Sequence, residues 1–594
     1  MAEHDRNYNE NSASLPLSSS AQISNTFRNE NQTHNTGSIS SVELAASHSP
    51  TIERPIEEIR MSAMLAESGD SSTHIISPAI ADDNEELDSY LSSDPAVGIR
   101  RITRTSSTST TMGPPSRRVL FNTVLRKPLG INANQSVAAA KLEVIEKLLE
   151  PHVMDLINIF FANVNVCFPI LDEASFRRTY TEHKDRLSPA LLANLYANAM
   201  TYWQNSPRLR SCHFPDQRYI WVQANEALHS ELFLSPGIST VISIILNVHG
   251  RPSTSMFGNG GMVGTAVALS NSLGLNRDCS AWNISPEEKA FRFRIWSIVV
   301  LMDRWTSLAY GTPLLIHRAQ YDVPVPSKEL LAQSKTSTTQ HTGFSVFLAM
   351  LTLTDVLSHY LEHVYHISRV TTTATDRSAS TPFHLETFLT DWEDTLDDDI
   401  RRLVLRGNDL DRAGAANLRL SYLAVKLLLR RIVCDNISSS PEHESAAQAR
   451  LQTQRVAEEI VLLVEELSHA HLRGFWMPMN GFTLTSATLF LLRDALKATN
   501  RTRNTSLKLA KDMITCLQNH RENQAWDLAD DCLTNCADMT NRIEAGKNVE
   551  SSGLADSQYV VDDDSLMFND GVFGFTTAFD FNFENFQWNE NIQQ

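Results

Sequence analysis

The sequence has few cysteines and no long apolar run. Its seven cysteines are scattered, and no stretch free of charged residues reaches the roughly 18 apolar residues that a membrane helix needs. Residues 1–20, MAEHDRNYNENSASLPLSSS, contain no apolar segment of a secretory signal. Without such a signal, the cysteines are expected to remain reduced thiols. These absences predict an intracellular, soluble protein with no membrane span.

The sequence also has fewer basic than acidic residues. The formal net charge is −18, from 51 Lys and Arg against 69 Asp and Glu, which argues against a globally basic nucleic-acid-binding protein. The two signs are nevertheless separated along the chain. Arg and Lys occur without any acid between them in residues 100–127, and no basic residue follows Lys547. The sequence therefore predicts a basic linker and an acidic C-terminal tail.

Composition divides the chain into four segments. Residues 1–115 are rich in Ser, Thr and Asn and poor in aromatics, so they cannot bury enough apolar surface to offset the entropy lost on ordering. We expect a disordered arm over 1–115 and a basic linker over 116–140. A helical domain is expected over 141–545, followed by an acidic-aromatic tail over 546–594.

The middle segment has the periodicity of α-helices. With 42% hydrophobic residues, the 594-residue chain can bury a large core. Apolar residues recur at intervals of three and four, as they do along one face of an amphipathic helix. Such faces are formed by Leu142, Ile145, Leu148 and Leu149; Met154, Ile157, Phe160 and Phe161; and Val456, Ile460, Leu463 and Leu467. Strand-like alternation is rare, so we predict an all-α fold, a helical array.

The stretch from Pro286 to Gly311 predicts a buried helix with two charges near its centre. Proline followed by two glutamates favours a helix start, and glycine favours a helix end. Its apolar positions are Phe291, Ile295, Ile298, Met302, Trp305 and Ala309. Asp303 and Arg304 are sequence neighbours about 100° apart around the helix, so they are not expected to pair with each other.

Each of these two charges should therefore need a partner from another helix, because a half-satisfied buried charge costs several kcal/mol. We interpret Asp303 and Arg304 as a structural ion-pair brace between helices. The alternatives are a ligand clamp and an acid–base pair, but the groups of an acid–base pair must converge on one reacting atom.

A run of short motifs extends on both sides of this helix. It includes S-L-G-L-x-R-D, a Trp before a polar turn, D-R-x-x-S-x-x-x-G-x-P and D-x-x-x-P. The residues concerned are Ser272 to Leu275, Arg277, Asp278, Trp282, Glu288, Arg292, Trp296, Asp303, Arg304, Ser307, Gly311, Pro313, Asp322 and Pro326. Upstream, Phe168 to Leu171 and Phe176 form F-P-I-L-x-x-x-x-F, and LRLSYLAVKLLLRRIV lies downstream.

In this order, the motifs resemble the middle homology region of the fungal binuclear-zinc-cluster transcription factors, over roughly residues 150–540. The resemblance implies an all-helical regulatory domain in a nuclear transcription factor. The segment FWMPMNGFTLTSATLFLLRDAL also resembles the branch of the family that acts as a general coactivator of nitrogen-utilisation genes.

The family's DNA-binding module is missing from the residues upstream of this region. It needs six cysteines, in two C-x2-C-x6-C runs, to hold the two zinc ions that stabilise it. No cysteine precedes Cys167, and Cys532 and Cys536 lack a matching second pair, so we expect neither zinc nor another cofactor. We expect recruitment to promoters through DNA-bound transcription factors. The alternative is a truncated product or gene model that lacks a zinc-cluster exon.

The C-terminal tail alternates acids with aromatic residues. Its aromatic positions are Phe568, Phe573, Phe575, Phe579, Phe581, Phe583, Phe586 and Trp588. Burying each aromatic yields roughly 1.5–3 kcal/mol, while the acids keep the free segment solvated. We interpret the tail as an activation segment that docks into a coactivator groove. The alternative is a solubilising tail that docks on the chain's own helices.

The arginine-rich stretch, residues 100–127, has three interpretations. Two arginine pairs flank residues 102–116, as in a bipartite nuclear-import signal; the alternative is a solvated linker. These pairs are Arg100, Arg101, Arg117 and Arg118. Thr105 and Ser106 follow arginines, a pattern that kinases read, and phosphates there would cancel the local positive field. A third interpretation is that these basic residues contact DNA phosphates, which would give little selectivity for DNA sequence.

Two other patterns suggest binding sites but have simpler interpretations. Gly258 to Gly264 lacks the Lys-Ser/Thr of a phosphate loop, so we expect an ordinary loop there. His359, His363 and His366 share one helical face without a nearby carboxylate or thiol, so we expect a solvated stripe and no metal.

We conclude from the sequence that this is a nuclear transcriptional regulator and not an enzyme. The resemblance suggests a coactivator or a pathway-specific regulator of catabolic or biosynthetic genes that works with coactivator machinery, and a homo- or heterodimer is compatible with it. The alternatives are a truncated, dominant-negative member that sequesters partners, or a helical metabolite-binding protein or enzyme without a role in gene regulation.

Overall fold

The computed structural model describes the following residues: 71–76, 101–105, 119–125, 136–234, 236–250, 256–282, 284–328, 338–365, 382–438, 443–497 and 500–551. Contacts divide the chain into two compact units, Met1–Arg54 and Pro55–Gln594, and every described residue belongs to the second. The segment predicted to be a tail, 546–594, is described only as far as Ser551.

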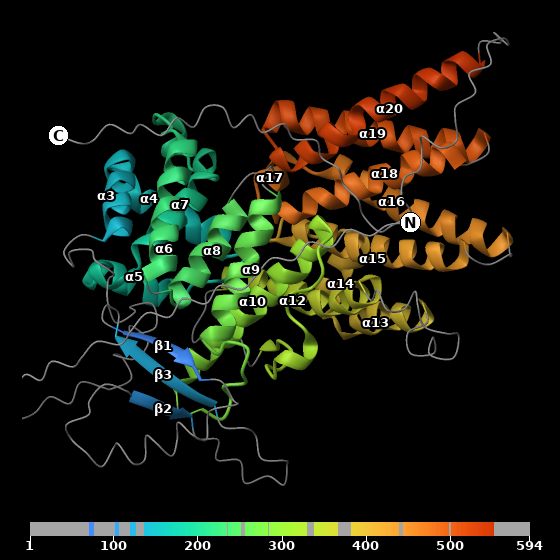
Figure 1. Ribbon diagram of the computed structural model, residues 1–594. Helices are drawn as coiled ribbons and strands as arrows, with labels where there is room; N and C mark the ends of the chain where they lie inside the picture. Colours follow the sequence, from blue (N-terminus) through green and yellow to red (C-terminus); the bar gives the residue numbers. More distant parts are fainter. Residues whose placement is uncertain are drawn as a thin grey trace, which may run out of the picture. The chain divides into compact units, whose positions relative to one another are not determined.

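The first group of helices surrounds one buried helix. It consists of α3 (Val137–Leu149), α4 (Val153–Ile159) with the π-helical turn η1 (Phe160–Asn165), α5 (Glu173–Glu182), α6 (Pro189–Met200), α7 (Gln217–Leu234) and α8 (Ile238–Gly250). Helix α6 is the centre, because α3, α4, α7 and α8 all pack against it (Figure 1). The Ser188 hydroxyl accepts a hydrogen bond from the Leu191 N–H, and Pro189 fits the first helical position.

Three long helices form the middle of the domain. They are α9 (Met256–Ser272), α10 (Pro286–Tyr310) and α12 (Thr338–Val364). The segment Gly343–Val364 of α12 is long and apolar enough to cross a membrane, but 67% of its most apolar window is buried within the protein. Since α12 packs against α10 and α15, its apolar surface is accounted for by the core.

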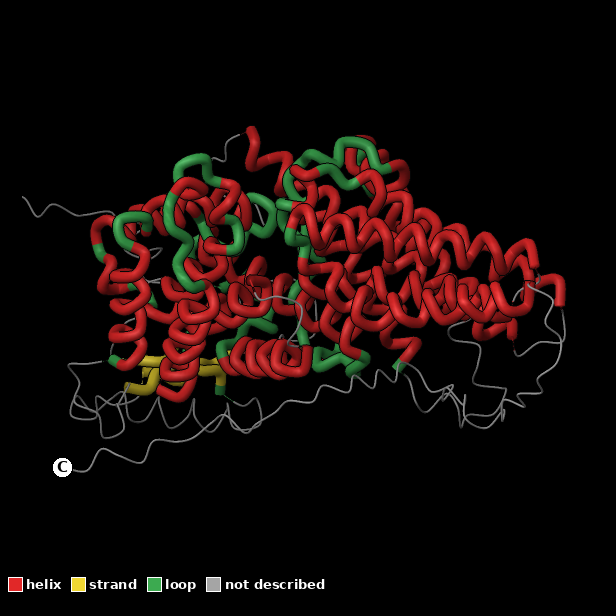
Figure 2. The backbone as a smooth tube through the Cα atoms, turned by 90° about the horizontal axis from the view of Figure 1, so that it is seen from above, coloured by secondary structure: helices red, strands yellow, loops and turns green. Residues whose placement is uncertain are grey.

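The last group consists of long helices that pack along one another, together with the shorter α14 and α17, and Figure 2 shows its helices as red tubes. Its members are α13 (Pro382–Thr395), α14 (Asp398–Arg406), α15 (Ala415–Ser438), α16 (His443–Glu466), α17 (His469–Leu472), α18 (Gly481–Lys497), α19 (Asn500–Gln524) and α20 (Asp530–Ser551). Short 3-10 helices occur at Lys184–Arg186, Trp203–Asn205, Leu209–Ser211, Arg318–Gln320, Pro478–Asn480 and Asp527–Ala529.

The all-α prediction is confirmed for this domain, and a small sheet adds an element that it did not include. Strands β1 (Ser71–Ile75), β2 (Arg101–Thr105) and β3 (Val119–Leu125) form an antiparallel sheet in the order β1-β3-β2. Ile75 pairs with Phe121, and Thr105 pairs with Val119. β1 and β2 lie in the range predicted to be disordered, and β3 lies in the predicted linker.

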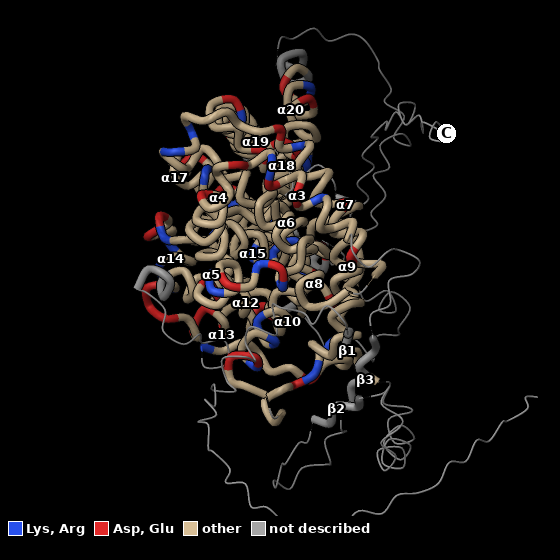
Figure 3. The backbone as a smooth tube through the Cα atoms, turned by 90° about the vertical axis from the view of Figure 1, so that its left-hand side faces the viewer, with Lys and Arg blue, Asp and Glu red and all other residues tan. Residues whose placement is uncertain are grey.

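One continuous apolar core runs from Ala138 in α3 to Cys536 in α20. Figure 3 shows acidic and basic positions interspersed along the helices. Every apolar position predicted for α10 is buried, and so are those predicted for α16. The predicted face of α3 is wrong at Leu148, and that of α4 is wrong at Met154, because both side chains are about half exposed.

Candidate functional site

The predicted charged pair lies on α10, a helix buried on nearly all sides. The Ser285 hydroxyl accepts a hydrogen bond from the Glu288 N–H (3.2 Å), and Pro286 occupies the first turn. At the other end, Gly311 adopts φ 70°, a conformation that costs glycine no steric penalty, and its N–H bonds the Ser307 carbonyl (3.1 Å). Both predicted ends of the helix are therefore confirmed.

Asp303 binds the chain that follows α10. Its carboxylate accepts hydrogen bonds from the backbone N–H groups of Leu315 (3.1 Å) and Ile316 (3.2 Å). It also pairs with the guanidinium of Arg304. The side chain is only 2% exposed, so these three contacts replace its hydration.

Arg304 connects α10 to α12. Its Nε donates to the Ser358 hydroxyl (2.8 Å), and the next residue, Trp305, donates from Nε1 to the Thr354 hydroxyl (3.0 Å). The prediction that Asp303 and Arg304 cannot pair is wrong, because the long arginine side chain reaches its neighbour's carboxylate. The predicted partner on another helix exists for Arg304 as Ser358, whereas Asp303 uses backbone N–H groups.

The environment of this pair fits a structural brace. Burial raises the pKa of the Asp303 carboxyl, and Arg304 with the two backbone N–H groups opposes that rise. Arg304 itself is fully buried. A reacting group must reach its substrate, and neither charge is open to solvent. The geometry therefore supports the structural interpretation over an acid–base pair.

A second carboxylate, that of Asp322, holds a later part of the same loop. Asp322 accepts hydrogen bonds from Arg277 Nε (3.1 Å) and from the backbone N–H of Asp278 (2.6 Å). Asn276 donates from Nδ2 to the Gln320 carbonyl (3.1 Å). In the described part of the loop after α10, residues 311–328, Asp303 thus holds the beginning and the turn after α9 holds Gln320 and Asp322.

An arginine completes that turn. Helix α9 ends with Gly274 at φ 65° and with a bond from the Leu275 N–H to the Ser270 carbonyl (2.9 Å). Arg292 of α10 donates from Nη2 to the Leu273 carbonyl (2.9 Å), so it caps the negative end of α9. Its guanidinium also lies over the Trp282 ring. Residues from several of the quoted motifs therefore meet in one network that positions α9, α10 and the loop.

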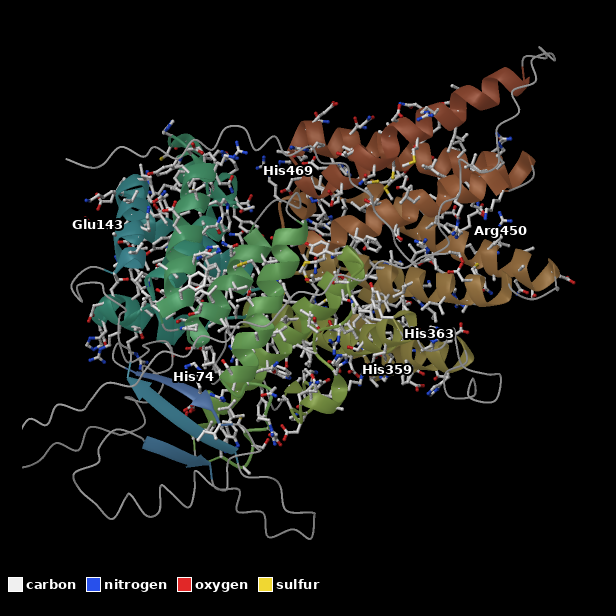
Figure 4. All side chains as sticks on the ribbon, viewed as in Figure 1. His74, Glu143, His359, His363, Arg450 and His469 are labelled. Atoms are coloured by element: carbon white, nitrogen blue, oxygen red, sulfur yellow. The ribbon has the colours of Figure 1, made fainter. Side chains whose placement is uncertain are left out.

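The other suggested sites have structural explanations. Gly258 to Gly264 lies inside α9, so the loop prediction is wrong. His359 and His363 lie on α12 (Figure 4), but His359 stacks on Phe388 with ring centroids 3.9 Å apart, so it is not a freely solvated side chain. Burial lowers the pKa of His359. His366 lies outside the described residues, within which no three metal-ligating side chains cluster.

The thiol of Cys516 is not activated for chemistry. Cys516 Sγ lies 3.2 Å from His520 Nε2, but burial raises the pKa of the thiol to about 11. The thiolate, which is the nucleophile, is therefore scarce at neutral pH. Cys532 and Cys536 are fully buried against α18, where Cys532 contacts Thr488 (3.3 Å).

A cavity between α10, α15 and α18 was not predicted. It is lined by Leu308, Ala424, Leu427, Leu428, Arg431, Phe482, Thr483 and Ser486 and has room for roughly one water molecule. That space is far below the roughly 300 Å³ or more of a small-molecule site. Residues from three separate helices form this cavity, so no sequence motif could have indicated it.

The remaining predicted site residues lie mostly outside the described residues. Arg101 begins β2 and Thr105 ends it. The positions outside are Arg100, Ser106, Arg117, Arg118 and all the aromatic positions of the tail. These interpretations stay predictions.

His249 at the end of α8 gives the domain a testable acid sensitivity. Its ring packs against Phe168 (4.4 Å between centroids) and Phe475 (5.6 Å), and burial lowers its pKa to about 3. The unfolded chain binds a proton below about pH 6.5, so stability is lost as pH falls from there towards 3. At pH 5 the expected loss is about 2 kcal/mol.

Denaturant unfolding at pH 7.5 and pH 5.0 measures this loss. The variant His249→Phe should lose less stability between the two pH values than the wild type, because it cannot take up the proton. The exposed His469 provides the control variant, His469→Phe. Equal losses in the wild type and in His249→Phe would contradict the assignment.

Comparison with known proteins identifies the class to which this domain belongs. Residues 157–392 match the model of the fungal specific transcription factor domain. The chain therefore carries a fungal specific transcription factor domain, and the resemblance drawn from its motifs is confirmed.

Relatives of known name are transcriptional regulators. An uncharacterised transcriptional regulatory protein of Schizosaccharomyces pombe is 28% identical over 57% of this chain and 49% of its own length. Transcriptional activator protein DAL81 of Saccharomyces cerevisiae is 23% identical over 57% of this chain and 38% of its own. The acetamidase regulatory protein of Aspergillus fumigatus is 24% identical over 48% and 35%, respectively. The matched part of the chain thus spans half or less of each relative.

Proposed function

We propose that this protein is a transcriptional regulator that acts in the nucleus through other proteins and catalyses no reaction. The observation that carries the proposal is the fungal specific transcription factor domain at residues 157–392. The buried Asp303–Arg304 brace supports it, because the charged pair that could have acted as an acid–base pair instead holds helices together. Membership of the nitrogen-utilisation coactivator branch stays a prediction.

Recruitment to promoters is proposed to depend on a DNA-bound partner. Residues 1–166 contain no cysteine, so they cannot supply the thiolates of a binuclear zinc cluster. The basic residues of 100–127 can attract DNA phosphates, but such contacts do not recognise the base sequence. Binding of DNA by these residues alone should therefore be weak and indifferent to sequence.

Comparing chromatin occupancy with binding by the purified chain tests this step. We expect specific fragments to be occupied in cells, which also reports entry into the nucleus. In gel shifts, the purified chain should bind those fragments no better than scrambled ones, and its binding should fall steeply between about 50 and 200 mM salt. Tight, sequence-selective binding by the purified chain would mean direct DNA recognition and would contradict recruitment through a partner.

Activation is proposed to come from residues 546–594. Aromatic residues there would supply the buried contacts, and the acids would keep the free segment solvated. Fused to a heterologous DNA-binding domain, this segment should activate a reporter at least about tenfold. The aromatic-to-serine variant keeps every acid and serves as the control, and it should lose most of the signal.

Two outcomes would favour rival functions. A tethered segment that fails to activate would support a truncated, dominant-negative protein that sequesters partners. Cytoplasmic localisation, together with a large thermal shift on adding one metabolite, would support a metabolite-binding protein or an enzyme.

A further inference from the structure

The small sheet has an edge strand, β2, with a partner on one side. The strand order is β1-β3-β2, so β3 is central, and within the part of the chain that the structure describes β2 pairs with β3 alone. Residues of an antiparallel pair alternate between those that bond to the partner strand and those whose backbone N–H and C=O groups point the other way. The outer edge of β2, Arg101–Thr105, therefore presents backbone groups to which another strand can add.

The sheet is attached to the helical domain through its other outer strand. β1 lies against α9, and Ile75, the last residue of β1, is half-buried and packs against the apolar core. Five residue pairs join β1 to β3, and five join β2 to β3. A strand that adds to the outer edge of β2 would thus be held to the helical domain through the sheet.

The charge of β2 favours an acidic occupant. The strand contains Arg101 and Arg104, and the three strands of the sheet contain no acid. The whole stretch 100–127 has seven basic residues and no acid. Charged residues on an edge strand discourage its pairing with a further copy of itself, because like charges would meet. An acidic strand is instead attracted, over a distance of about 10 Å at 0.1 M salt.

A segment outside the described residues has both the charge and the periodicity of a matching strand. Residues 552–594 contain eight acids and no base. Within them, residues 579–584, FDFNFE, alternate a phenylalanine with a polar residue, which is an acid at Asp580 and Glu584. A period of two is that of a β-strand with one apolar and one polar face. The sequence of this run therefore fits the basic edge of β2.

The run is far enough along the chain to reach the sheet. Ser551 is the last described residue of α20, and 27 residues separate it from Phe579. A segment of that length spans up to about 90 Å when it is extended. A compact domain of roughly 400 residues has a radius of gyration of about 21 Å, so the segment can reach any side of it.

We propose that residues 579–584 add to the outer edge of β2 as a fourth strand of the sheet. The backbone groups of the two strands bond to one another, and the acids of the run offset the charge of Arg101 and Arg104. The docked run covers part of the stretch 100–127, so fewer of its basic residues are open to DNA phosphates. Its phenylalanines are also withheld from a coactivator, a consequence that rests on the proposed activating role of 546–594.

Hydrogen exchange of the purified full chain tests the docking, with mass spectrometry of the peptide that contains residues 101–105. The amides that point away from β3 should exchange at least about tenfold more slowly than in a chain that ends at Ser551, because the added strand protects them. The protection should not change between about 1 and 50 μM protein, since the occupant belongs to the same chain. Protection that grows with concentration would mean that the tail of a second copy occupies the edge, and it would overturn the proposal.

Paired prolines separate the addition of a strand from a general attraction of charge. Phe581→Pro combined with Asn582→Pro keeps every acid but removes two consecutive N–H groups, one of which must point towards β2. The exchange of residues 101–105 should then match that of the chain that ends at Ser551. Thr576→Pro combined with Thr577→Pro is the matched control outside the run and should leave the protection unchanged.

Two results would overturn the docking. One is equal exchange of residues 101–105 in the full chain and in the chain that ends at Ser551. The other is protection that survives the two prolines within the run. The exchange experiment makes no use of activation, whereas the reporter assay of residues 546–594 does, so failure of the docking and failure of the proposed function are distinguishable.

Discussion

Asp303→Ala should lower the free energy of unfolding by about 3–5 kcal/mol, the loss typical of removing one partner from a buried ion pair. The substitution leaves the fully buried guanidinium of Arg304 without its carboxylate. It also leaves the N–H groups of Leu315 and Ile316 without their acceptor. Denaturant unfolding of the purified domain-containing chain measures the effect.

The control is an ion pair of the same type on the surface. Asp355 pairs with Arg318 at 2.9 Å, and both side chains are about one-third exposed. Asp355→Ala should cost only about 0–1 kcal/mol, because water screens the pair and solvates the partner left behind. Similar losses for Asp303→Ala and Asp355→Ala would mean that the buried brace is no stronger than a surface contact.

A double-mutant cycle separates the pair from its surroundings. Arg304→Met removes the charge and keeps much of the side-chain volume, so combining it with Asp303→Ala removes the stranded cation. The double variant should therefore lose clearly less than the sum of the two single losses. Hydrogen exchange at Leu315 and Ile316 should still be faster than in the wild type, because their acceptor is gone in both backgrounds.

Periodicity predicted α10 correctly and α3 only in part. In α10 apolar residues occur on all sides of the helix, so whichever face is predicted to meet the core is buried. In α3 two adjoining apolar rows exist, and the sequence cannot tell which of them meets the core. Leu142, Ile145 and Leu149 face inward, while Leu148 belongs to the exposed row beside α7. When a helix has more apolar residues than the core can cover, its periodicity is compatible with two different buried faces.

The candidate site shows a similar limit. The burial of Asp303 and Arg304 could be predicted from their apolar neighbours in the sequence. The groups to which they bind could not. The partners of Asp303 are backbone N–H groups, which every residue except proline carries and no side-chain pattern marks. The geometry that brings them close depends on the left-handed turn at Gly311, which reverses the chain. Strands β1 to β3 were missed because each is only five to seven residues long and lies in a segment whose overall composition is that of a disordered arm or linker.

The motif network also explains what the family resemblance means physically. Asp303, Asp322 and Arg292 bind the loop, the turn and the end of α9, and each makes its hydrogen bonds to backbone groups of these segments. The motifs therefore specify a scaffold. Regulation by this chain is expected to reside in its exposed faces and flanking segments, such as residues 546–594.

Gly343→Ala should be the most damaging small substitution in the domain, with an expected loss of about 3 kcal/mol. Gly343 lies in α12 where that helix crosses the backbone of Val166, and an added Cβ would sit far inside van der Waals contact with the Val166 carbonyl oxygen. That carbonyl cannot easily move. The adjacent Asn165 side chain bonds both the carbonyl (3.0 Å) and the N–H (2.9 Å) of Leu171, which fixes the turn.

The matched control is Gly261→Ala in α9. Gly261 is also inside a helix, but a Cβ there meets nothing within 4 Å. Alanine should therefore stabilise the domain by about 0.5–1 kcal/mol through its higher helix propensity. Opposite signs in the two variants, measured by denaturant unfolding, would establish that close backbone approach, and not helix propensity, requires glycine at 343. A stabilising Gly343→Ala would mean that α12 and the Val166 segment can move apart at little cost, and the packing of α12 against the first group of helices would then be looser than the contacts indicate.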